Sequence, residues 1–305
     1  QTLFAATEGM DSTKPLSVFL GLTIRRRTSA GAGPIAVAVE LIGDGAEPLT
    51  LATAEVGADA LTVHATVRVA GGTQAPFAPV SVADFAGNLS AAEDYWKTKI
   101  EPARGPSVPE PRVMTAWKAW LANSLVHVRR DEAGLLYPQD GVLFYEAVYG
   151  YSAALFCSML SRFGLAHHAK AYLSSLLRMV APDGLFTLNF GLPDHGALLV
   201  AISDFYLITR DDEWFAEAAP TVEKMVDWVI TTRQAALANQ TQGSKTHGLI
   251  FYRPYCDHAD PEFSYLSDTY LVLGLEAAAR ALQASANKSS GERVWRAAAS
   301  YRRDV

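Results

Sequence analysis

The sequence predicts a multidomain β + α protein, in which a β-sandwich portion is followed by an array of antiparallel helical hairpins. Three observations lead to this fold class. Apolar residues alternate with polar ones over 1–90, prolines are concentrated within 91–111, and the hydrophobic period becomes 3.6 residues over 112–305. At 305 residues the chain is long enough for about two domains with separate cores. We therefore expect a strand domain, a linker and a helical domain.

Three runs in the first part have the pattern of strands. Residues 17–24, 35–42 and 61–69 are rich in β-branched side chains and are bounded by Gly, Pro or Asp. Their alternation would give an antiparallel sheet one face for a core and one for water. Residues 91–100 have the pattern of a short helix, and the prolines of 102–111 indicate a linker that cannot continue it.

The second part has the pattern of seven helices. An apolar stripe that runs from Val113 to Val128 predicts the first of them, and Pro220 is suited to the first turn of the fifth, where its missing N–H costs nothing. The predicted helices cover residues 112–130, 145–163, 166–180, 196–209, 219–238, 265–283 and 291–303.

The connections between these helices alternate between long and short. Residues 131–144, 181–195 and 239–264 form long connections, whereas 163–165 is a short one. In an antiparallel array, alternate connections emerge at the same end, so we expect the long loops to gather on one rim, where binding sites are commonly found. The alternative is that the long loops merely follow the surface of the array.

Composition excludes several classes of function. The chain has 26 basic and 32 acidic residues, a net charge of −6, and no basic stripe, so we predict no nucleic-acid partner. No apolar run reaches the ~20 residues that span a bilayer, so this stretch is predicted to be soluble without a transmembrane segment. Gln1–Phe4 does not begin a signal peptide, and we expect a piece of a longer protein. Compartment and oligomeric state stay open.

Three stretches of the helical part carry a family resemblance. Phe190–Ala201, Asp204–Phe215 and the region from Thr246 to Leu275 are similar to the loops and helix starts of the six-hairpin glycosidases, the (α/α)6-barrel group that includes glucoamylase and bacterial relatives. The resemblance implies a partial (α/α)6 toroid. It also implies a glycoside hydrolase of the inverting type that acts on an oligo- or polysaccharide, with its general base beyond this chain.

Two departures from the family pattern keep other functions open. Gly150–Tyr151 stands where the family often has an Arg-Asp pair that grips the sugar, and seven helices are predicted where a full barrel has twelve. One alternative is therefore a non-catalytic carbohydrate-binding relative. Another is a polysaccharide lyase on a similar toroid, for which Tyr255, His258 and Arg253 offer a base and a neutralising group.

The catalytic candidates lie just before the sixth helix. Inverting hydrolysis needs a protonated carboxylic acid and a carboxylate ~6.5–9.5 Å away that activates water. By its offset to the following helix, Glu262 matches the family's general acid; the alternative is a carboxylate that interacts with the helix N-terminus. Asp257 is the second choice, or else a turn residue that bonds its own backbone.

Three polar residues are candidates for sugar binding. The resemblance makes Asp194 an acceptor for a sugar hydroxyl, whereas Asp is also a good N-cap. His195 could donate to a hydroxyl or be a satisfied histidine of the rim. Glu146 faces the same rim if the second helix begins near Tyr145, and could equally be a surface residue.

Aromatic residues on the long loops are candidate platforms for the flat apolar faces of sugars. Tyr145 and Tyr255 are the ones we select, and Arg253 is a possible bidentate partner for a hydroxyl or carboxylate, or a member of a structural ion pair. The other aromatic residues of these loops are Tyr137, Phe144, Phe186, Phe190, Phe251, Tyr252 and Phe263. No zinc spacing, Walker loop or dinucleotide fingerprint occurs, so we predict no metal and no cofactor.

Overall fold

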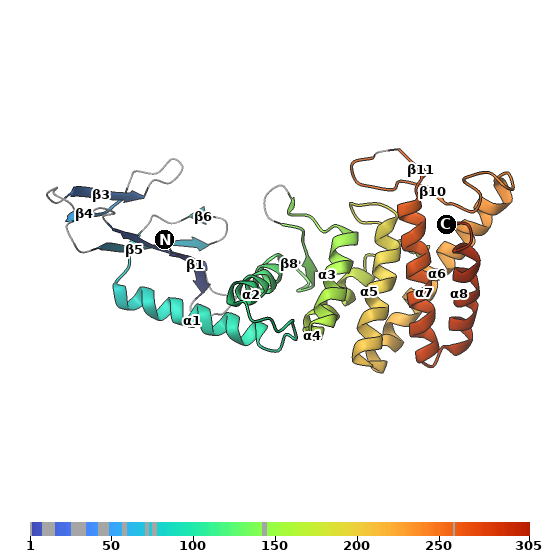
Figure 1. The fold of residues 1–305 in the computed structure, drawn as a ribbon, viewed down its shortest axis with the longest axis horizontal. Coiled ribbons are helices and arrows are strands. Elements are labelled where there is room, and N and C mark those ends of the chain that lie inside the picture. The colour runs from blue at the N-terminus through green and yellow to red at the C-terminus, as the bar shows by residue number, and fades with distance from the viewer. Residues whose placement is uncertain are drawn as a thin grey trace. The chain divides into compact units, whose positions relative to one another are not determined.

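The computed structural model is a mixed α and β fold with eight helices and small antiparallel sheets in the part of the chain that it describes (Figure 1). The described residues are 2–7, 16–25, 35–41, 49–56, 60–70, 73–74, 78–141, 145–258 and 260–305. The chain divides into two compact units, residues 1–101 and 102–305, which we describe in turn.

The first unit contains antiparallel strands. One sheet has the order β1-β2-β5-β6, with β7 also paired to β5, and β3 and β4 form a separate pair. The three predicted strands are confirmed as β2, β3 and β5, although Ile42 lies outside the described residues. The bounds are β1 (Thr2–Thr7), β2 (Leu16–Ile24), β3 (Ile35–Leu41), β4 (Leu49–Val56), β5 (Leu61–Ala70), β6 (Thr73–Gln74) and β7 (Ala78–Pro79).

The helix of the first unit, α1 (Val82–Ile100), begins nine residues before the predicted start at 91. Ser81 caps it: its Oγ accepts a hydrogen bond from the Asp84 N–H at 3.0 Å and donates one to the Asp84 carboxylate at 2.7 Å. The Phe85 ring packs edge-on against Phe19 of β2, with centroids 6.5 Å apart. This contact makes α1 part of the strand unit, where the sequence had suggested a linker helix.

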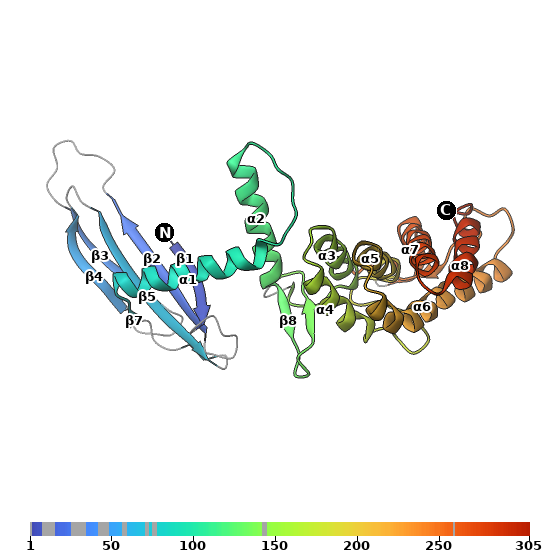
Figure 2. The ribbon, with the colours of Figure 1, turned by 90° about the horizontal axis from the view of Figure 1, so that it is seen from below.

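The second unit contains the seven helices that the sequence predicts. They are α2 (Pro111–Val126), α3 (Gly150–Arg162), α4 (Ala166–Leu177), α5 (Pro193–Thr209), α6 (Asp212–Asn239), α7 (Tyr265–Ala284) and α8 (Lys288–Tyr301). Short turns join α3 to α4, α5 to α6 and α7 to α8, so the chain reverses in three hairpins. Helices α3, α5 and α7 lie next to one another, and α4 and α6 lie on one side of them (Figure 2).

Two predicted helix boundaries are wrong because backbone groups bond elsewhere. The helix predicted over 112–130 ends at Val126, and Val128–Arg130 forms strand β8, which pairs with β9 (Leu136–Pro138). The helix predicted to begin at 145 begins at Gly150. The carbonyl groups of Tyr145 and Val148 instead accept hydrogen bonds from the Gly141 N–H and the Asn189 side chain.

The start of α6 also differs from its prediction. The helix begins at Asp212, so Pro220 lies inside it rather than in its first turn. The Asp211 side chain supplies the cap by accepting a hydrogen bond from the Trp214 N–H at 3.1 Å. Proline in a helix interior removes one backbone hydrogen bond. Pro220 is exposed here, so water can reach the carbonyl group that is left without its helical partner.

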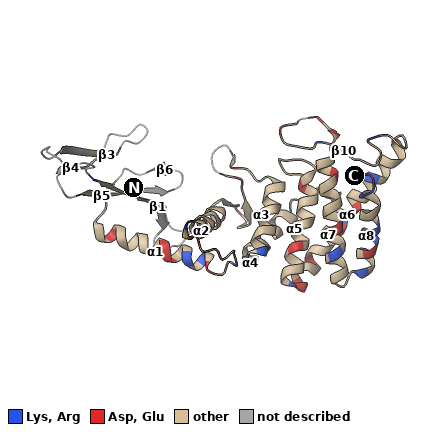
Figure 3. Ribbon diagram, in the orientation of Figure 1, with Lys and Arg blue, Asp and Glu red and all other residues tan. Residues whose placement is uncertain are grey.

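Helix α5 is the centre of the second unit. Of its residues only Ile208 is exposed, and its two charged residues are Asp194 and Asp204 (Figure 3). The backbones of α5 and α7 approach closely at Gly196, where an added Cβ would lie 2.1 Å from the carbonyl oxygen of Tyr270. Of the helices in the described part of the chain, none has the length and apolar character that crossing a bilayer requires.

Candidate functional site

The three long loops of the second unit meet at the N-terminal ends of α3, α5 and α7. They are loop A (127–149), loop B (178–192) and loop C (240–264). Loops A and B are joined where the Gly150 N–H donates to the Leu188 carbonyl at 2.7 Å and where Asn189 donates to the Val148 carbonyl at 2.8 Å. The Leu192 N–H donates to the Arg253 carbonyl at 3.0 Å and joins loops B and C. The predicted gathering of these loops is therefore confirmed, and we call this end the rim.

Four half-buried aromatic side chains form a cluster on the rim. Tyr151 of α3 stacks on Phe190 of loop B with ring centroids 4.8 Å apart, and Phe190 meets Tyr255 of loop C edge-on at 4.7 Å. The hydroxyl oxygens of Tyr151 and Tyr270, the latter from α7, are 2.5 Å apart. Burial is the main cause that raises the pKa of Tyr151 to about 12, and the Tyr270 hydroxyl adds to it. We call these four residues the rim cluster.

Asp194 holds loop B to the start of α5. It is the second residue of the helix and is fully buried, and its Oδ2 accepts hydrogen bonds from the N–H groups of Leu188 and Gly191. Burial raises its pKa to about 7, although these backbone donors act in the opposite direction. Leu192 occupies the N-cap position, so Asp194 does not cap α5. Asp194 is also closed to solvent, whereas the expected role in binding a sugar hydroxyl requires an accessible carboxylate.

His195 is likewise a structural residue of the interior. Its Nδ1 accepts a hydrogen bond from the Phe186 N–H at 3.2 Å, which leaves the proton on Nε2 to be donated to the Met225 carbonyl at 3.1 Å. Burial lowers its pKa to about 4, so the ring is neutral near pH 7. The structure fits the interpretation of His195 as a histidine whose hydrogen bonds are satisfied within the protein, because the ring bridges loop B and α6 and is 0% exposed.

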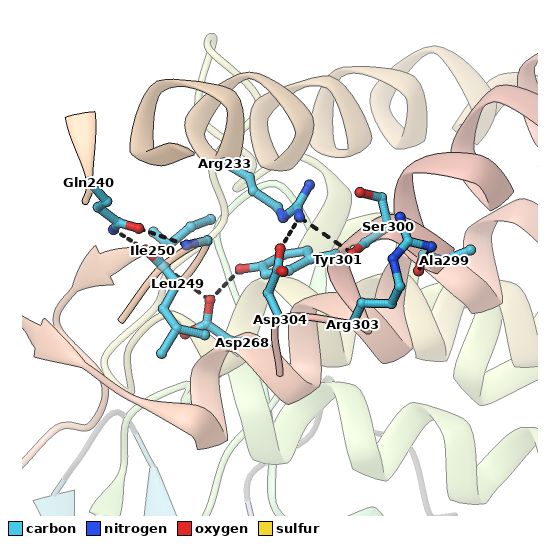
Figure 4. Close-up of polar contacts among 11 residues, drawn as sticks. Arg233, Gln240, Leu249, Ile250, Asp268, Ala299, Ser300, Tyr301, Arg303 and Asp304 are labelled. Carbon is cyan, nitrogen blue, oxygen red and sulfur yellow. Dashed lines mark hydrogen bonds and ion pairs between the residues drawn. The ribbon is translucent and has the colours of Figure 1, made fainter. Parts of the chain in front are cut away.

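Asp268, in the first turn of α7, anchors loop C as Asp194 anchors loop B. Its Oδ1 accepts hydrogen bonds from the Ile250 N–H at 3.0 Å and from the Tyr301 hydroxyl (Figure 4). Burial raises the pKa of Asp268 to about 6. The Arg233 guanidinium lies over the Tyr301 ring, 4.7 Å from its centroid, and forms an ion pair with Asp304. Loop C is thus tied to α6, α7 and the end of α8.

The predicted catalytic residues lie on the surface of loop C. Glu262 belongs to a two-residue strand, β11 (Glu262–Phe263), which pairs with β10 (Phe251–Tyr252), and it is exposed. Asp257 is exposed as well. The residue before α7 that occupies the N-cap position is Ser264, so Glu262 does not cap this helix.

The remaining predicted site residues also lie on or beside the rim. Tyr145 is 54% exposed and its ring is 6.4 Å from that of Tyr149. Glu146 is exposed, and its backbone carbonyl accepts a hydrogen bond from the Gln139 side chain. Arg253 is half-buried without an ion-pair partner in the described part of the chain, and Tyr255 belongs to the rim cluster. Phe144 lies outside the described residues.

Sequence patterns alone miss Asp268, Tyr151 and Tyr270. Asp268 shares a signal with Asp194, since both are acidic residues in the first turn of a helix that follows a long loop. Tyr151 and Tyr270 have no such signal, because their hydroxyl groups meet across 119 residues of sequence. Among the described residues, no three His, Cys, Asp or Glu side chains are grouped as metal ligands.

The sequence matches none of the known family models, and no curated protein is similar to it at a significant level.

Proposed function

We propose that this protein binds an oligo- or polysaccharide at the rim and hydrolyses its glycosidic bonds. The observation that carries the proposal is the rim cluster, in which α3, loop B, loop C and α7 each contribute one half-buried aromatic ring. Aromatic rings bind the apolar faces of sugars, and their hydroxyl groups bind the sugar's edge. The cluster also lies on a frame of packed helices, as a preorganised site requires.

The chemical part of the proposal assigns Glu262 as general acid, with Asp257 as the second choice. A general acid must be protonated at the working pH, and burial is the usual means of achieving this. Glu262 is exposed, so the proposal requires that bound polysaccharide covers it. The support for this requirement is that Glu262 lies on loop C, the loop that also carries Tyr255 of the rim cluster.

A second candidate, a carbohydrate-binding protein without hydrolytic activity, is favoured by a specific observation. Glu262 and Asp257 are both exposed, and Asp194 is fully buried, so none of the three has the partial burial that acid catalysis favours. A lyase has less support. Nearby Cys256, and then Asp257, raise the pKa of Tyr255, which keeps its hydroxyl protonated at neutral pH and leaves less phenolate to act as the base.

The experiment compares the wild type with Glu262→Gln, and with Glu217→Gln as a matched control at an exposed Glu on α6, outside the three loops. Release of reducing ends from a panel of polysaccharides measures hydrolysis, and calorimetry measures binding. Loss of the acid should reduce turnover about 10²–10⁴-fold and leave binding unchanged, whereas Glu217→Gln should retain full activity.

The other outcomes separate the candidates. Binding without hydrolysis by the wild type would favour the second candidate, and unchanged turnover in Glu262→Gln would remove the acid assignment. Products with a new double bond, detected by their ultraviolet absorbance, would show a lyase. If no polysaccharide binds, or if Phe190→Ala binds as tightly as the wild type, the rim is not a carbohydrate site.

A further inference from the structure

A hollow that none of the rim-cluster residues lines lies between α2, the β8–β9 hairpin and α3. Its volume is about 290 Å³, at the small end of the range for ligand sites. Its wall combines four largely apolar residues (Trp120, Pro138, Ala153 and Phe156) with six polar ones (Asn123, Ser124, His127, Gln139, Asp140 and Ser152). Four of these residues belong to loop A, but none belongs to the rim cluster or to the residues proposed for hydrolysis.

The aromatic part of the wall is an exposed and well-supported indole. Trp120 is 47% exposed, although it lies within a helix. One side of it packs edge-on against Phe163, with ring centroids 6.3 Å apart, and Phe163 also meets Trp117 edge-on at 5.8 Å. Trp120 is therefore held in place by the protein while almost half of the residue's surface stays exposed.

The polar part of the wall is centred on Asp140. Its Oδ1 accepts a hydrogen bond from the Ser152 hydroxyl at 2.5 Å, and its Oδ2 has no partner in the described part of the chain. Partial burial of the carboxyl raises its pKa even though the residue as a whole is exposed. Gln139 is held at two points of the loop. Its backbone N–H donates a hydrogen bond to the His127 carbonyl, and its side chain donates one to the Glu146 carbonyl.

The charges of the lining restrict the class of ligand. Among the described residues that line it, Asp140 is the only acidic one and none is Lys or Arg, so none carries the permanent positive charge that neutralises a phosphate or carboxylate. Several neutral donors and acceptors beside one aromatic face suit a ligand that has many hydroxyl groups and a flat apolar side. The volume restricts it to about one ring.

We propose that the hollow between α2, β9 and α3 is a binding site for a single neutral pyranose ring, which stacks on Trp120 and donates a hydroxyl to Oδ2 of Asp140. The site goes beyond the function proposed for the rim and does not depend on it. On α3, Tyr151 belongs to the rim cluster and the adjacent Ser152 to the hollow, about 100° around the helix.

The test titrates the whole 305-residue chain with the methyl glycosides of glucose, galactose, mannose and N-acetylglucosamine. Tryptophan fluorescence and ligand-observed NMR report binding. We expect saturable binding of at least one glycoside by the wild type. Trp120→Ala should weaken it by about tenfold or more, because the stacking surface is lost. Asp140→Asn should weaken it by about threefold or more, because the amide places a donor where the sugar hydroxyl donates.

Two control variants make the result specific. Trp295→Ala removes a tryptophan of nearly the same exposure, 45%, from α8, and should bind as the wild type does. Phe190→Ala disrupts the rim cluster and should leave binding in the hollow unchanged, which separates this inference from the function of the rim. Circular dichroism checks that each variant is folded, and Asn123→Ala, at an exposed position, replaces Trp120→Ala if that variant does not fold.

Three results would overturn the proposal. The first is the absence of saturable binding of every glycoside to the wild type. The second is that two variants bind the glycosides as tightly as the wild type does. These are Asp140→Asn and the folded one of Trp120→Ala and Asn123→Ala. The third is binding of tetramethylammonium in place of the glycosides, which would show that the indole and the carboxylate form a site for cations.

Discussion

The contact between α5 and α7 leads to a sharp prediction for Gly196→Ala. A Cβ at this position would lie 2.1 Å from the carbonyl oxygen and 2.3 Å from the carbonyl carbon of Tyr270. Real Cβ atoms do not come closer than 3.0 Å, so the helices must separate by about 3.0 − 2.1 = 0.9 Å. Both atoms belong to the backbone of α7, and no side-chain rotation can relieve the contact.

The expected magnitude follows from two opposing effects. Overpacking of a tight core costs about 1–3 kcal/mol. The upper end applies here, because separating α5 from α7 also weakens the dispersion contacts between their neighbouring side chains. This cost is partly offset, because alanine stabilises a helix by about 1 kcal/mol relative to glycine. We expect the free energy of unfolding to fall by about 2 kcal/mol, which for a unit of this size lowers the melting temperature by about 4–8 °C.

Thermal unfolding followed by circular dichroism measures this change. Gly87→Ala is the control, because Gly87 lies in α1 and has nothing within 4 Å of its added Cβ. That variant should be stabilised by about 0.5–1 kcal/mol. A melting temperature of Gly196→Ala equal to or above that of the wild type would refute the reasoning that the two backbones are in contact at this point.

Two further predictions concern the buried carboxylates that anchor the loops. Tyr301→Phe keeps the ring but removes the hydroxyl that donates to Asp268, and should lower the free energy of unfolding by about 1.5–3 kcal/mol in urea titrations; a loss below 0.5 kcal/mol, about the error of such titrations, would contradict it. The pKa of Asp194 is about 7 in the folded state and near 4 in the unfolded state. Ionisation of Asp194 therefore disfavours the folded state, and the stability that the protonated form contributes is lost as pH rises from about 4 to about 7. Asp194→Asn should therefore gain stability relative to the wild type over this pH range, and a constant difference between the two would show that Asp194 is ionised throughout.

The helices of the second unit could be predicted from sequence because their apolar periodicity is local information. Their ends could not be predicted as well. The start of α3 depends on hydrogen bonds from Gly150 to Leu188 and from Asn189 to Val148, and these partners are about 40 residues apart. Such contacts leave no pattern in a single stretch of sequence. The start of α1 was readable, since Ser81 and Asp84 have the spacing of a capping box.

The site shows the same division between local and distant information. The rhythm of long and short connections was enough to predict that loops A, B and C meet. The burial of Asp194 and His195 was not predictable, because it depends on how closely loop B and α6 cover the start of α5. A polar residue at a helix start after a long loop looks the same in sequence whether it contacts a ligand or anchors the loop.

The enclosure of α5 has a consequence for how this protein can change over time. Neighbouring segments lie against this helix on nearly every side, and only Ile208 is exposed. A substitution on an outer helix can be absorbed by water or by a shift of one side chain, whereas one on α5 has to be matched by a change in a facing segment. We expect variants of this protein to accept many substitutions on the outer helices, while α5 and the residues that face it change together or stay as they are.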